Sequence, residues 1–228
     1  MNDPRLEPNI FYIAKLALSI HEVEIVSDEG AFLLLNDRTA CIFYILVFRD
    51  CVNVDPLMEI ALRYQKTVAV ASLEKFPLGD YGFPHHRTTR QFTFEGSPLP
   101  VDTSAYSIED VTMGDLPYIL DHYLRIGEDD EYVINAINRG MIKAVGEDGS
   151  TMGFIGEHPE HTLGMLYVDE SHRRKGIGRN LEYAMINRFL EKGKRPLDHV
   201  VVDNQKSNGL QSSIPGMKLD DGYFEWLF

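Results

Sequence analysis

The sequence predicts an α/β (α+β) protein with a small N-terminal domain and a larger C-terminal one. Short apolar, β-branched runs alternate with segments of helical spacing along the whole chain. A Gly- and Pro-containing stretch, Gly96 to Pro100, separates two such regions. We therefore expect an N-terminal α/β domain at residues 1–96, a linker at 97–103 and a second domain at 104–228.

The first half should contain mainly strands. We expect an amphipathic helix at 10–18, and a second helix at 55–64 that Asp55 caps and Pro56 begins. The strands and the one long irregular loop are expected at 22–26, 31–35, 41–48, 67–71, 73–90 (the loop) and 91–94.

The second half alternates strand and helix more regularly. Thr112 and Asp115 form a capping-box pattern that begins a helix, and Gly140 and Gly193 follow two further helical segments. The helices are expected at 112–124, 129–139 and 178–192. The strands are expected at 107–111, 141–145, 152–156, 162–168 and 199–202.

Composition and charge restrict the classes of partner. The 228 residues are 44% hydrophobic and 25% charged, as in an ordinary globular protein. Lys and Arg number 22 against 35 Asp and Glu, which gives a net charge of −13. Such a surface repels phosphate backbones, so we expect no nucleic-acid partner. It suits a cationic or neutral amine ligand, and it also serves simple solubility.

The cysteines and the apolar runs indicate a cytoplasmic protein. Cys41 and Cys51 are the only cysteines, too few for a disulfide framework. Met1 to Pro8 does not resemble a signal peptide. The most apolar stretch, Ala40 to Phe48, is far shorter than a membrane helix and reads as a buried strand. We expect no membrane partner.

The chemically most informative segment runs from Arg173 to Arg179, between a strand and a helix. Gly176 and Gly178 let a ligand approach the backbone closely. The helix that follows offers unpaired N–H groups and the positive end of its dipole, which together bind anions such as a pyrophosphate. Four basic side chains and no acid lie here. A dinucleotide-binding motif is disfavoured, because Leu181 stands where that motif needs a third glycine. The alternative to an anion site is a plain strand-to-helix turn with solvated basic side chains.

The Arg173-x-x-Gly176-x-Gly178 segment, after the strand at 163–168, resembles the Arg/Gln-x-x-Gly-x-Gly/Ala motif of the GNAT acetyltransferase superfamily. The strand at 200–202, with Asn204 and Ser207 after it, resembles the superfamily's next strand and helix. The resemblance covers residues 104–228. It implies a GNAT acyl-CoA acyltransferase fold with a mixed, mostly antiparallel sheet.

The resemblance also implies which residues bind the co-substrate, acetyl-CoA or another acyl-CoA. The strand backbone would pair with the pantetheine arm, and the N–H groups after Arg173 would hold the pyrophosphate. Asn204 would reach the pantetheine or thioester region, and its alternative is a turn former at the end of a strand. The residues so assigned are Leu166, Tyr167, Val168, Arg173, Arg174, Lys175, Gly176, Ile177, Gly178, Arg179 and Asn204.

The sequence departs from the superfamily at two catalytic places. Many members carry a proton-donating Tyr where this chain has Gln211 and Ser212, so Ser207 or water would relay that proton. Many also carry a Glu where this chain has Thr162. The candidate bases are then the nearby turn residues Glu157, His158, Glu160 and His161, with His161 and Glu157 preferred. The His-Pro-Glu-His turn has no third ligand nearby, so we expect no metal.

The predicted function is N-acyl transfer from acyl-CoA to a primary amine of a small molecule or amino acid, by direct attack in a ternary complex. The alternative is a non-catalytic acyl-CoA-binding regulator. Gly153 to His158 and Trp226 to Phe228 resemble a two-domain branch that includes the glycine N-acyltransferases. In that branch the N-terminal half is a degenerate half-copy of the fold. A homodimer is the assembly we consider.

Overall fold

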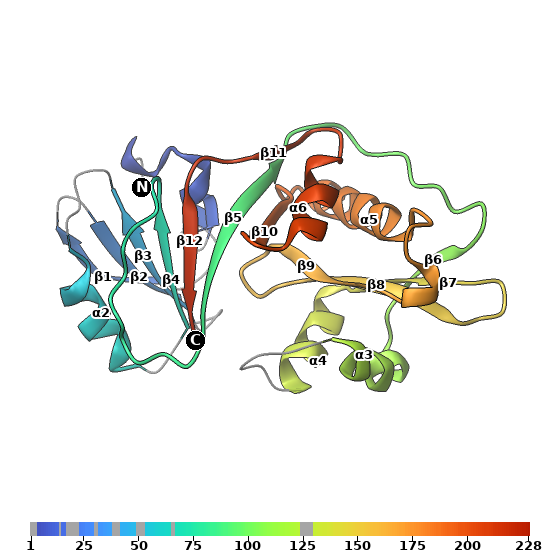
Figure 1. The fold of residues 1–228 in the computed structure, drawn as a ribbon, viewed down its shortest axis with the longest axis horizontal. Helices are drawn as coiled ribbons and strands as arrows, with labels where there is room; N and C mark the ends of the chain where they lie inside the picture. Colours follow the sequence, from blue (N-terminus) through green and yellow to red (C-terminus); the bar gives the residue numbers. More distant parts are fainter. Residues whose placement is uncertain are drawn as a thin grey trace. The chain divides into compact units, whose positions relative to one another are not determined.

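The computed structural model describes residues 4–13, 15–16, 23–29, 32–37, 42–48, 53–64, 67–123 and 130–228, with backbone alone at 23–29 and 32–37 (Figure 1). Cys41, Cys51 and parts of the expected helices at 10–18 and 112–124 lie outside these residues. The chain divides into two compact units. Unit 1 is Met1–Phe92, His199–Asn208 and Leu219–Phe228, and unit 2 is Thr93–Asp198 and Gly209–Lys218.

Unit 1 is built on a mixed sheet. Its strands, in spatial order, are β1 (Val23–Glu29), β2 (Phe32–Asp37), β3 (Ile42–Val47), β4 (Thr67–Ser72), β12 (Tyr223–Leu227) and β5 (His86–Phe94). β3 and β4 are parallel, and β12 is antiparallel to both β4 and β5. Two 3₁₀ helices, Pro4–Leu6 and Asn9–Phe11, precede the sheet.

The apolar run predicted as a buried strand is β3, all of whose side chains are buried. Helix α2 (Asp55–Leu62) packs on it through Leu57, Met58 and Ala61, and contributes to one hydrophobic core. The expected cap is displaced by one residue: Val54 is the N-cap, and Asp55 is already helical. The Asp55 carboxylate accepts a hydrogen bond from the Tyr81 hydroxyl at 2.6 Å instead.

Unit 2 contains the expected alternation. Strands β6 (Ser107–Asp110), β7 (Ile142–Val145), β8 (Thr151–Glu157) and β9 (Leu163–Val168) are antiparallel neighbours, and β10 (Leu197–Val201) begins in this unit parallel to β9. The other elements are η3 (Met113–Asp115), α3 (Leu116–His122), α4 (Asp130–Arg139), η4 (Glu170–His172), α5 (Ile177–Glu191), α6 (Gln205–Ser212, shared with unit 1) and β11 (Met217–Leu219, reaching unit 1 at its last residue).

Helices cover both faces of this second sheet (Figure 1). α5 packs on β7, β8 and β9, and α4 packs on β8. Thr112 and Asp115 make the predicted capping box. Gly140 and Gly193 have the positive φ angles, 107° and 68°, expected where helices stop. The mixed, mostly antiparallel sheet is therefore confirmed. None of the helices among the described residues has the length and apolar character needed to cross a bilayer.

The compact units do not follow the boundary expected at 97–103. The C-terminal strand β12 pairs with β4 and β5, so Leu219–Phe228 belongs with the N-terminal half. β5 also starts at His86, five residues before the strand expected at 91–94. Its first residues are exposed, polar and aligned by β12, which a reading of local hydrophobicity does not detect.

The two units share an order of connections. In unit 1, antiparallel β2 and β3 lead through α2 to β4, which is parallel to β3. In unit 2, antiparallel β8 and β9 lead through α5 to β10, which is parallel to β9. This recurrence supports the half-copy expectation. The segment 48–54 before α2 contains no glycine, so the close approach of a ligand predicted before α5 is not expected there.

Candidate active site

The loop between β9 and α5 has the backbone shape of an anion site. Gly176 is the N-cap of α5 with φ 83°, a left-handed conformation that favours glycine, and Arg174 also has a positive φ, 61°. The first backbone N–H of the helix to find a helical acceptor is that of Asn180. Within the described chain, the N–H groups of residues 174–179 have no acceptor. They are free to bind an anion at the positive end of a 15-residue helix.

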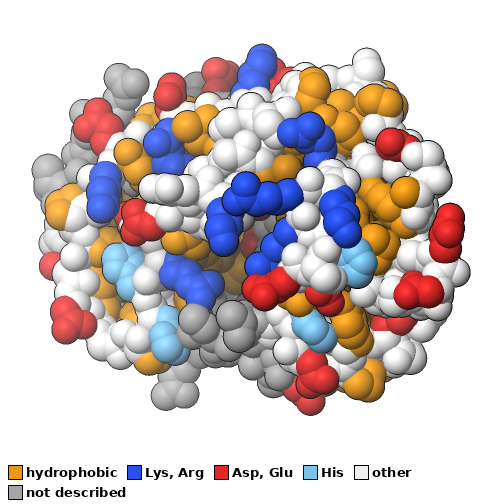
Figure 2. All heavy atoms as spheres, turned by 45° about the vertical axis from the view of Figure 1, so that its right-hand side comes forward, with side chains coloured by type: hydrophobic (Ala, Val, Ile, Leu, Met, Phe, Trp, Pro, Cys, Tyr) orange, Lys and Arg blue, Asp and Glu red, His pale blue; other side chains and the backbone are white. Residues whose placement is uncertain are grey.

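The basic side chains of this loop are exposed. The Arg173 guanidinium reaches back to the strand and donates to the Val168 carbonyl at 2.9 Å, which fixes the loop against the end of β9. Arg179 donates to the Ser213 hydroxyl at 3.2 Å. Lys and Arg side chains reach solvent on the face drawn in Figure 2, among Asp and Glu side chains. The exposed basic side chains of the loop give it a local positive charge on an acidic protein.

β9 and β10 pair at a single position, Asp198 with Leu163. The second half of β9 therefore has no partner in β10, although its other edge pairs with β8. Met165 has φ 56°, and the register with β8 shifts between Phe154 and Gly156, so β9 carries a bulge there. Beyond the bulge, the edge of Leu166 to Val168 is available to an extended ligand, as the resemblance implies.

Asn204 and Ser207 lie in unit 1, at the start of α6. The Asn204 side-chain oxygen accepts from the Ser207 N–H at 3.1 Å, which makes Asn204 the helix cap. Asn204 therefore does form the turn at the end of the strand, which was the alternative to a ligand contact. It uses only Oδ1, and Nδ2 has no partner among the described residues, so the predicted pantetheine contact stays a prediction.

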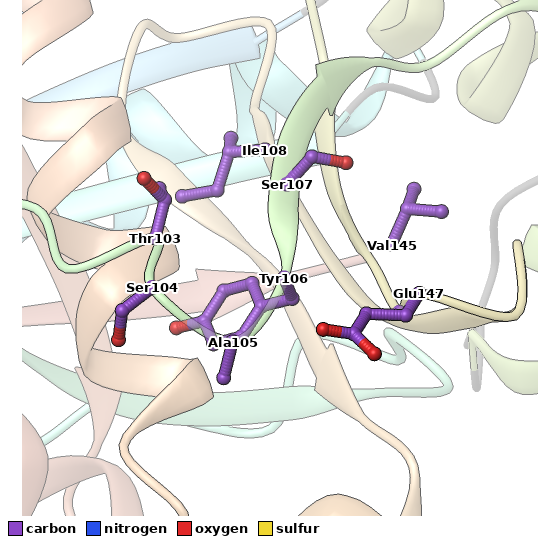
Figure 3. A pocket seen from close by; sticks show the side chains of 9 residues that line it. Thr103, Ser104, Ala105, Tyr106, Ser107, Ile108, Val145 and Glu147 are labelled. Carbon is purple, nitrogen blue, oxygen red and sulfur yellow. The ribbon is translucent and has the colours of Figure 1, made fainter.

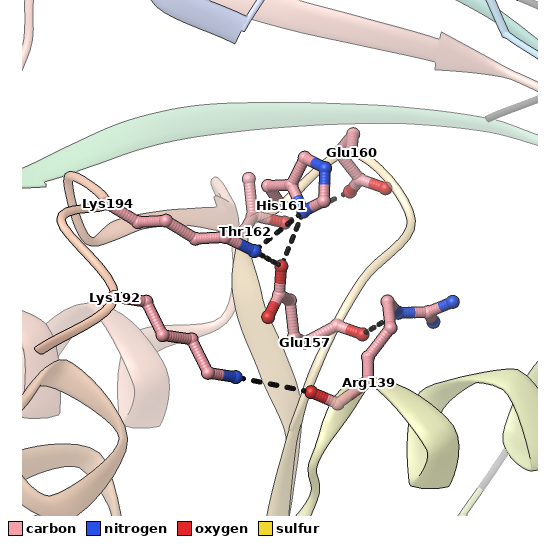
Figure 4. A network of polar contacts seen from close by, with 7 residues as sticks. All are labelled: Arg139, Glu157, Glu160, His161, Thr162, Lys192 and Lys194. Carbon is pink, nitrogen blue, oxygen red and sulfur yellow. Dashed lines mark hydrogen bonds and ion pairs between the residues drawn. The ribbon is translucent and has the colours of Figure 1, made fainter. Parts of the chain in front are cut away.

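Glu157 and His161 form one polar network (Figure 4). The Glu157 carboxylate, with 3% of its side chain exposed, lies 2.5 Å from His161 Nδ1 and 2.7 Å from Lys194 Nζ. Lys194 Nζ is also 3.3 Å from the same histidine nitrogen, and Arg139 Nε donates to the Glu157 carbonyl at 3.0 Å. The network connects β8, the turn after it, the last residue of α4 and the segment that follows α5.

The charges of this network decide what Glu157 can do. Burial acts to raise the pKa of Glu157, but the hydrogen bonds from His161 and Lys194 outweigh it, and the net pKa lies below its usual value. A carboxylate with a lowered pKa is a weak base. Of the two preferred candidates, Glu157 is therefore disfavoured as the proton acceptor.

His158 is packed rather than solvated. Its Nδ1 contacts the Tyr132 hydroxyl, and burial lowers the pKa of its imidazole. A Cβ at Gly164 would lie 2.1 Å from His158 Nε2, so this glycine leaves room for the ring. His158 therefore holds the turn through packing against Gly164 and its contact with Tyr132.

Gln211, at the place of the superfamily's Tyr, is buried and joins two carboxylates. Its Nε2 donates to Glu182 Oε1 at 3.0 Å and to Asp198 Oδ2 at 2.5 Å. Burial, and then the charge of Asp198, raise the pKa of Glu182 well above its usual value. Burial and the charge of Asp198 therefore favour the protonated form of Glu182, behind a residue that cannot donate a proton to a thiolate. Sequence spacing gave no sign of this pair.

The raised pKa makes stability depend on pH. In the unfolded chain the pKa of Glu182 is near 4.5, and in the folded protein it is higher. The contribution of Glu182 to the free energy of unfolding is therefore fully present below pH 4.5 and is lost as pH rises through the folded pKa. Glu182→Gln cannot ionise. We expect it to gain stability relative to wild type between pH 5 and pH 8, measured by urea unfolding, while Glu191→Gln on the exposed side of α5 shows no such trend. A pH-independent difference for Glu182→Gln would contradict this.

An open hollow of about 540 Å³ lies beside the edge strand β6. Figure 3 shows the residues around the start of β6 on one side and Val145 and Glu147 on the other. The Tyr106 hydroxyl in its wall accepts from Asn180 Nδ2 at 2.5 Å, which links it to the first turn of α5. None of the predicted site residues lines this hollow.

Comparisons with known proteins agree with this fold. Residues 140–225 match the family of FR47-like proteins. A putative GNAT-family acetyltransferase from Novosphingobium aromaticivorans is similar in structure, with a TM-score of 0.63, 13% identity, and coverage of 99% of this chain and 98% of that one. A Drosophila protein is similar in structure with a TM-score of 0.64 and 15% identity, and the match covers 96% of this chain and 89% of that one. A tandem GNAT protein from the clavulanic acid biosynthesis pathway has a TM-score of 0.50 and 15% identity, and the match covers 94% of this chain and 86% of that one. No curated protein matches in sequence.

The chain has the GNAT acetyltransferase fold that the resemblance implied. The segment from Gly140 to Glu225 is similar to FR47-like proteins. The relation to the glycine N-acyltransferases stays a prediction.

Proposed function

We propose that the protein transfers an acyl group, with acetyl as the first choice, from acyl-CoA to a primary amine of a small molecule or amino acid. The observation that carries this proposal is the row of free N–H groups at residues 174–179, framed by exposed basic side chains and left-handed Gly176. An anion such as the CoA pyrophosphate satisfies such groups. The open edge of β9 after Met165 supports an extended pantetheine arm beside it.

The reaction proposed is direct attack of the amine on the thioester carbonyl. Most of the rate would come from holding the two reactants together, and from backbone donors that stabilise the tetrahedral oxyanion. The amine must be neutral to attack. At pH 7 this costs roughly 4–5 kcal/mol for a lysine-like amine and about 1 kcal/mol for an α-amine. With Glu157 a weak base, an acceptor amine of low pKa is favoured.

One observation favours the alternative, a non-catalytic acyl-CoA-binding protein. Gln211 occupies the place of the tyrosine acid and its amide is engaged by Glu182 and Asp198. If the protein is an enzyme, Ser207 or water must then protonate the leaving thiolate.

Release of free thiol separates the two functions. The full-length protein should bind CoA in calorimetry, and should release thiol from acetyl-CoA only with certain members of a panel of α-amino acids, alkylamines and diamines. CoA binding without amine-dependent release across the panel would favour the regulator. Absence of CoA binding would overturn both proposals.

A further inference from the structure

His122, the last residue of α3, lies where this helix meets the open edge of β9. The helix begins over β8, where the Tyr118 ring packs edge-on against Phe154 and its hydroxyl donates to the Thr151 carbonyl at 3.2 Å. One turn later the His122 ring contacts the Tyr167 ring of β9, with 4.9 Å between the ring centres. The end of α3 therefore lies against the part of β9 that follows the bulge.

The backbone determines which nitrogen of His122 can accept a proton. His122 Nδ1 lies 2.7 Å from the Tyr118 carbonyl oxygen. A carbonyl oxygen only accepts hydrogen bonds, so Nδ1 carries the hydrogen of the neutral imidazole and Nε2 carries the lone pair. Nε2 has no partner among the residues that the structure describes, and the side chain is only partly buried.

Tyr118 is a stable support for this ring. Its own ring lies 4.2 Å from that of His122, at a tilt of 31°. Burial, and then the charge of Asp169, raise the pKa of Tyr118 to about 12. The Tyr118 hydroxyl therefore stays protonated at neutral pH and continues to donate to the Thr151 carbonyl, which holds α3 on β8.

Helix α5 covers the opposite face of the same strand edge, as Figure 1 shows for the two sides of this sheet. A Cβ at Gly178 in α5 would lie 3.5 Å from Val168 Cγ2 and 3.9 Å from Leu166 Cδ2. Tyr167 alternates with these two residues and packs against the core on the side of α3 and α4. His122 and the free edge of β9 therefore belong to the same face of unit 2.

This placement limits how an acceptor can reach a bound acyl-CoA. With the pyrophosphate at residues 174–179, an extended arm would pass Val168 and run along the edge of β9 toward Met165, with the thioester at its far end. Because α5 covers one face of this edge, the acceptor amine has to approach from the face that carries Tyr167 and His122. All of these residues lie in unit 2, so the site needs nothing from the other unit.

Two other histidines near β9 are less suited to take up a proton. His161 Nδ1 lies 3.3 Å from Lys194 Nζ, and the charge of that ammonium opposes a second cation beside it. Burial lowers the pKa of His158, whose Nδ1 is engaged by the Tyr132 hydroxyl. Among the described residues, neither a lysine nor an arginine hydrogen-bonds to His122.

We propose that Nε2 of His122 accepts the proton of the acceptor amine. The inference rests on the proposed function. The amine nitrogen forms a bond to the thioester carbonyl carbon, and its proton passes to His122 Nε2. Collapse of the tetrahedral intermediate breaks the carbon–sulfur bond and yields the amide. The proton then returns from His122 to the CoA thiolate, directly or through water, which gives CoA thiol and restores the neutral imidazole.

Two replacements of His122 in the full chain separate proton transfer from packing. Both are assayed with acetyl-CoA and the amine that wild type turns over fastest in the panel above. For His122→Ala we expect kcat/KM to fall by about 100-fold or more, the size of a general-base contribution. Added imidazole should recover at least about tenfold of this loss, because a small base enters the space left by the ring.

His122→Phe keeps an aromatic ring against Tyr118 and Tyr167 but has no nitrogen. We expect the same loss of kcat/KM as in His122→Ala, no recovery with imidazole because the ring still fills the space, and CoA affinity within about twofold of wild type in calorimetry. His85→Phe, the same change at an exposed histidine, is the matched control and should keep kcat/KM within about twofold. Circular dichroism shows that each variant is folded.

The outcomes have distinct meanings. Wild type that acylates nothing in the panel overturns the proposed function, and the role of His122 with it. With active wild type, the role of His122 alone is overturned if His122→Phe stays within about threefold, if imidazole does not restore His122→Ala, or if CoA affinity falls as far as kcat/KM does. A loss of about 100-fold in His161→Ala, with both His122 variants unaffected, assigns the proton to the Glu157 network instead.

Discussion

Replacing Gly178 by Glu should weaken CoA binding at least about tenfold, or roughly 1.4 kcal/mol. A Cβ at this position makes only ordinary contacts, 3.5 Å to Val168 Cγ2 and 3.9 Å to Leu166 Cδ2, so the new side chain fits the fold. Its carboxylate, however, enters the space beside the free N–H groups of residues 174–179. There it competes with the pyrophosphate for the same donors and repels it.

Calorimetry with CoA measures this effect directly. Gly114→Glu is the matched control, because Gly114 is exposed in the short 3₁₀ helix η3, and its Cβ would meet only the Thr112 hydroxyl at 3.5 Å. That variant adds the same charge to the same unit and should bind CoA as wild type does. A folded Gly178→Glu protein with wild-type affinity would show that the pyrophosphate does not bind at this loop.

This loop could be predicted from sequence because its chemistry is local. The strand, the glycine pair, the basic residues and the start of α5 are consecutive, and each signals its structure by itself. The capping box at Thr112 and the stop at Gly140 were predictable for the same reason. Where the spacing of residues within one element determines its geometry, a single sequence is sufficient to predict that element.

Pairing between distant strands is not local, and it was not predicted. β12 pairs with β5 about 140 residues earlier in the chain and with β4 still earlier, and Glu225 and His86 are separated by 139 positions. Many antiparallel partners would satisfy the apolar alternation of Tyr223 to Leu227 equally well. The residues 104–228 therefore resemble a complete domain in sequence, although their last strand completes the sheet of the other unit.

The same distinction explains the buried carboxylates. Glu157, Glu182 and Glu225 all read as surface residues in a sequence so rich in acids. Each is buried because a tertiary contact compensates its charge or keeps its proton: Lys194 for Glu157, Asp198 and Gln211 for Glu182, and His86 with Thr88 for Glu225. Buried carboxylates of this kind are identified only by the fold.

Gly153 in β8 lets the backbone of the predicted pantetheine strand, β9, lie close to it, and its replacement should lower the stability of the fold. A Cβ at Gly153 would lie 2.5 Å from the Tyr167 carbonyl oxygen and 3.1 Å from Val168 Cα, both backbone atoms that cannot rotate away. We expect Gly153→Ala to lower the free energy of unfolding by about 1–3 kcal/mol, as overpacking does. For a chain of this size each 1 kcal/mol lowers the melting temperature by roughly 2–4 °C.

The functional consequence follows from the same displacement. Moving Tyr167 and Val168 away from β8 shifts the backbone groups that would pair with the pantetheine arm, so CoA affinity should fall together with stability. Thermal unfolding and calorimetry of Gly153→Ala test both effects. Gly209→Ala is the control: its Cβ meets nothing within 4 Å and it lies in helix α6, so it should be as stable as wild type or more stable by up to about 1 kcal/mol. If Gly153→Ala melts at the wild-type temperature, the strand has room to adjust. If it is destabilised but binds CoA normally, the edge of β9 does not hold the pantetheine, and only the loop before α5 carries the proposed co-substrate.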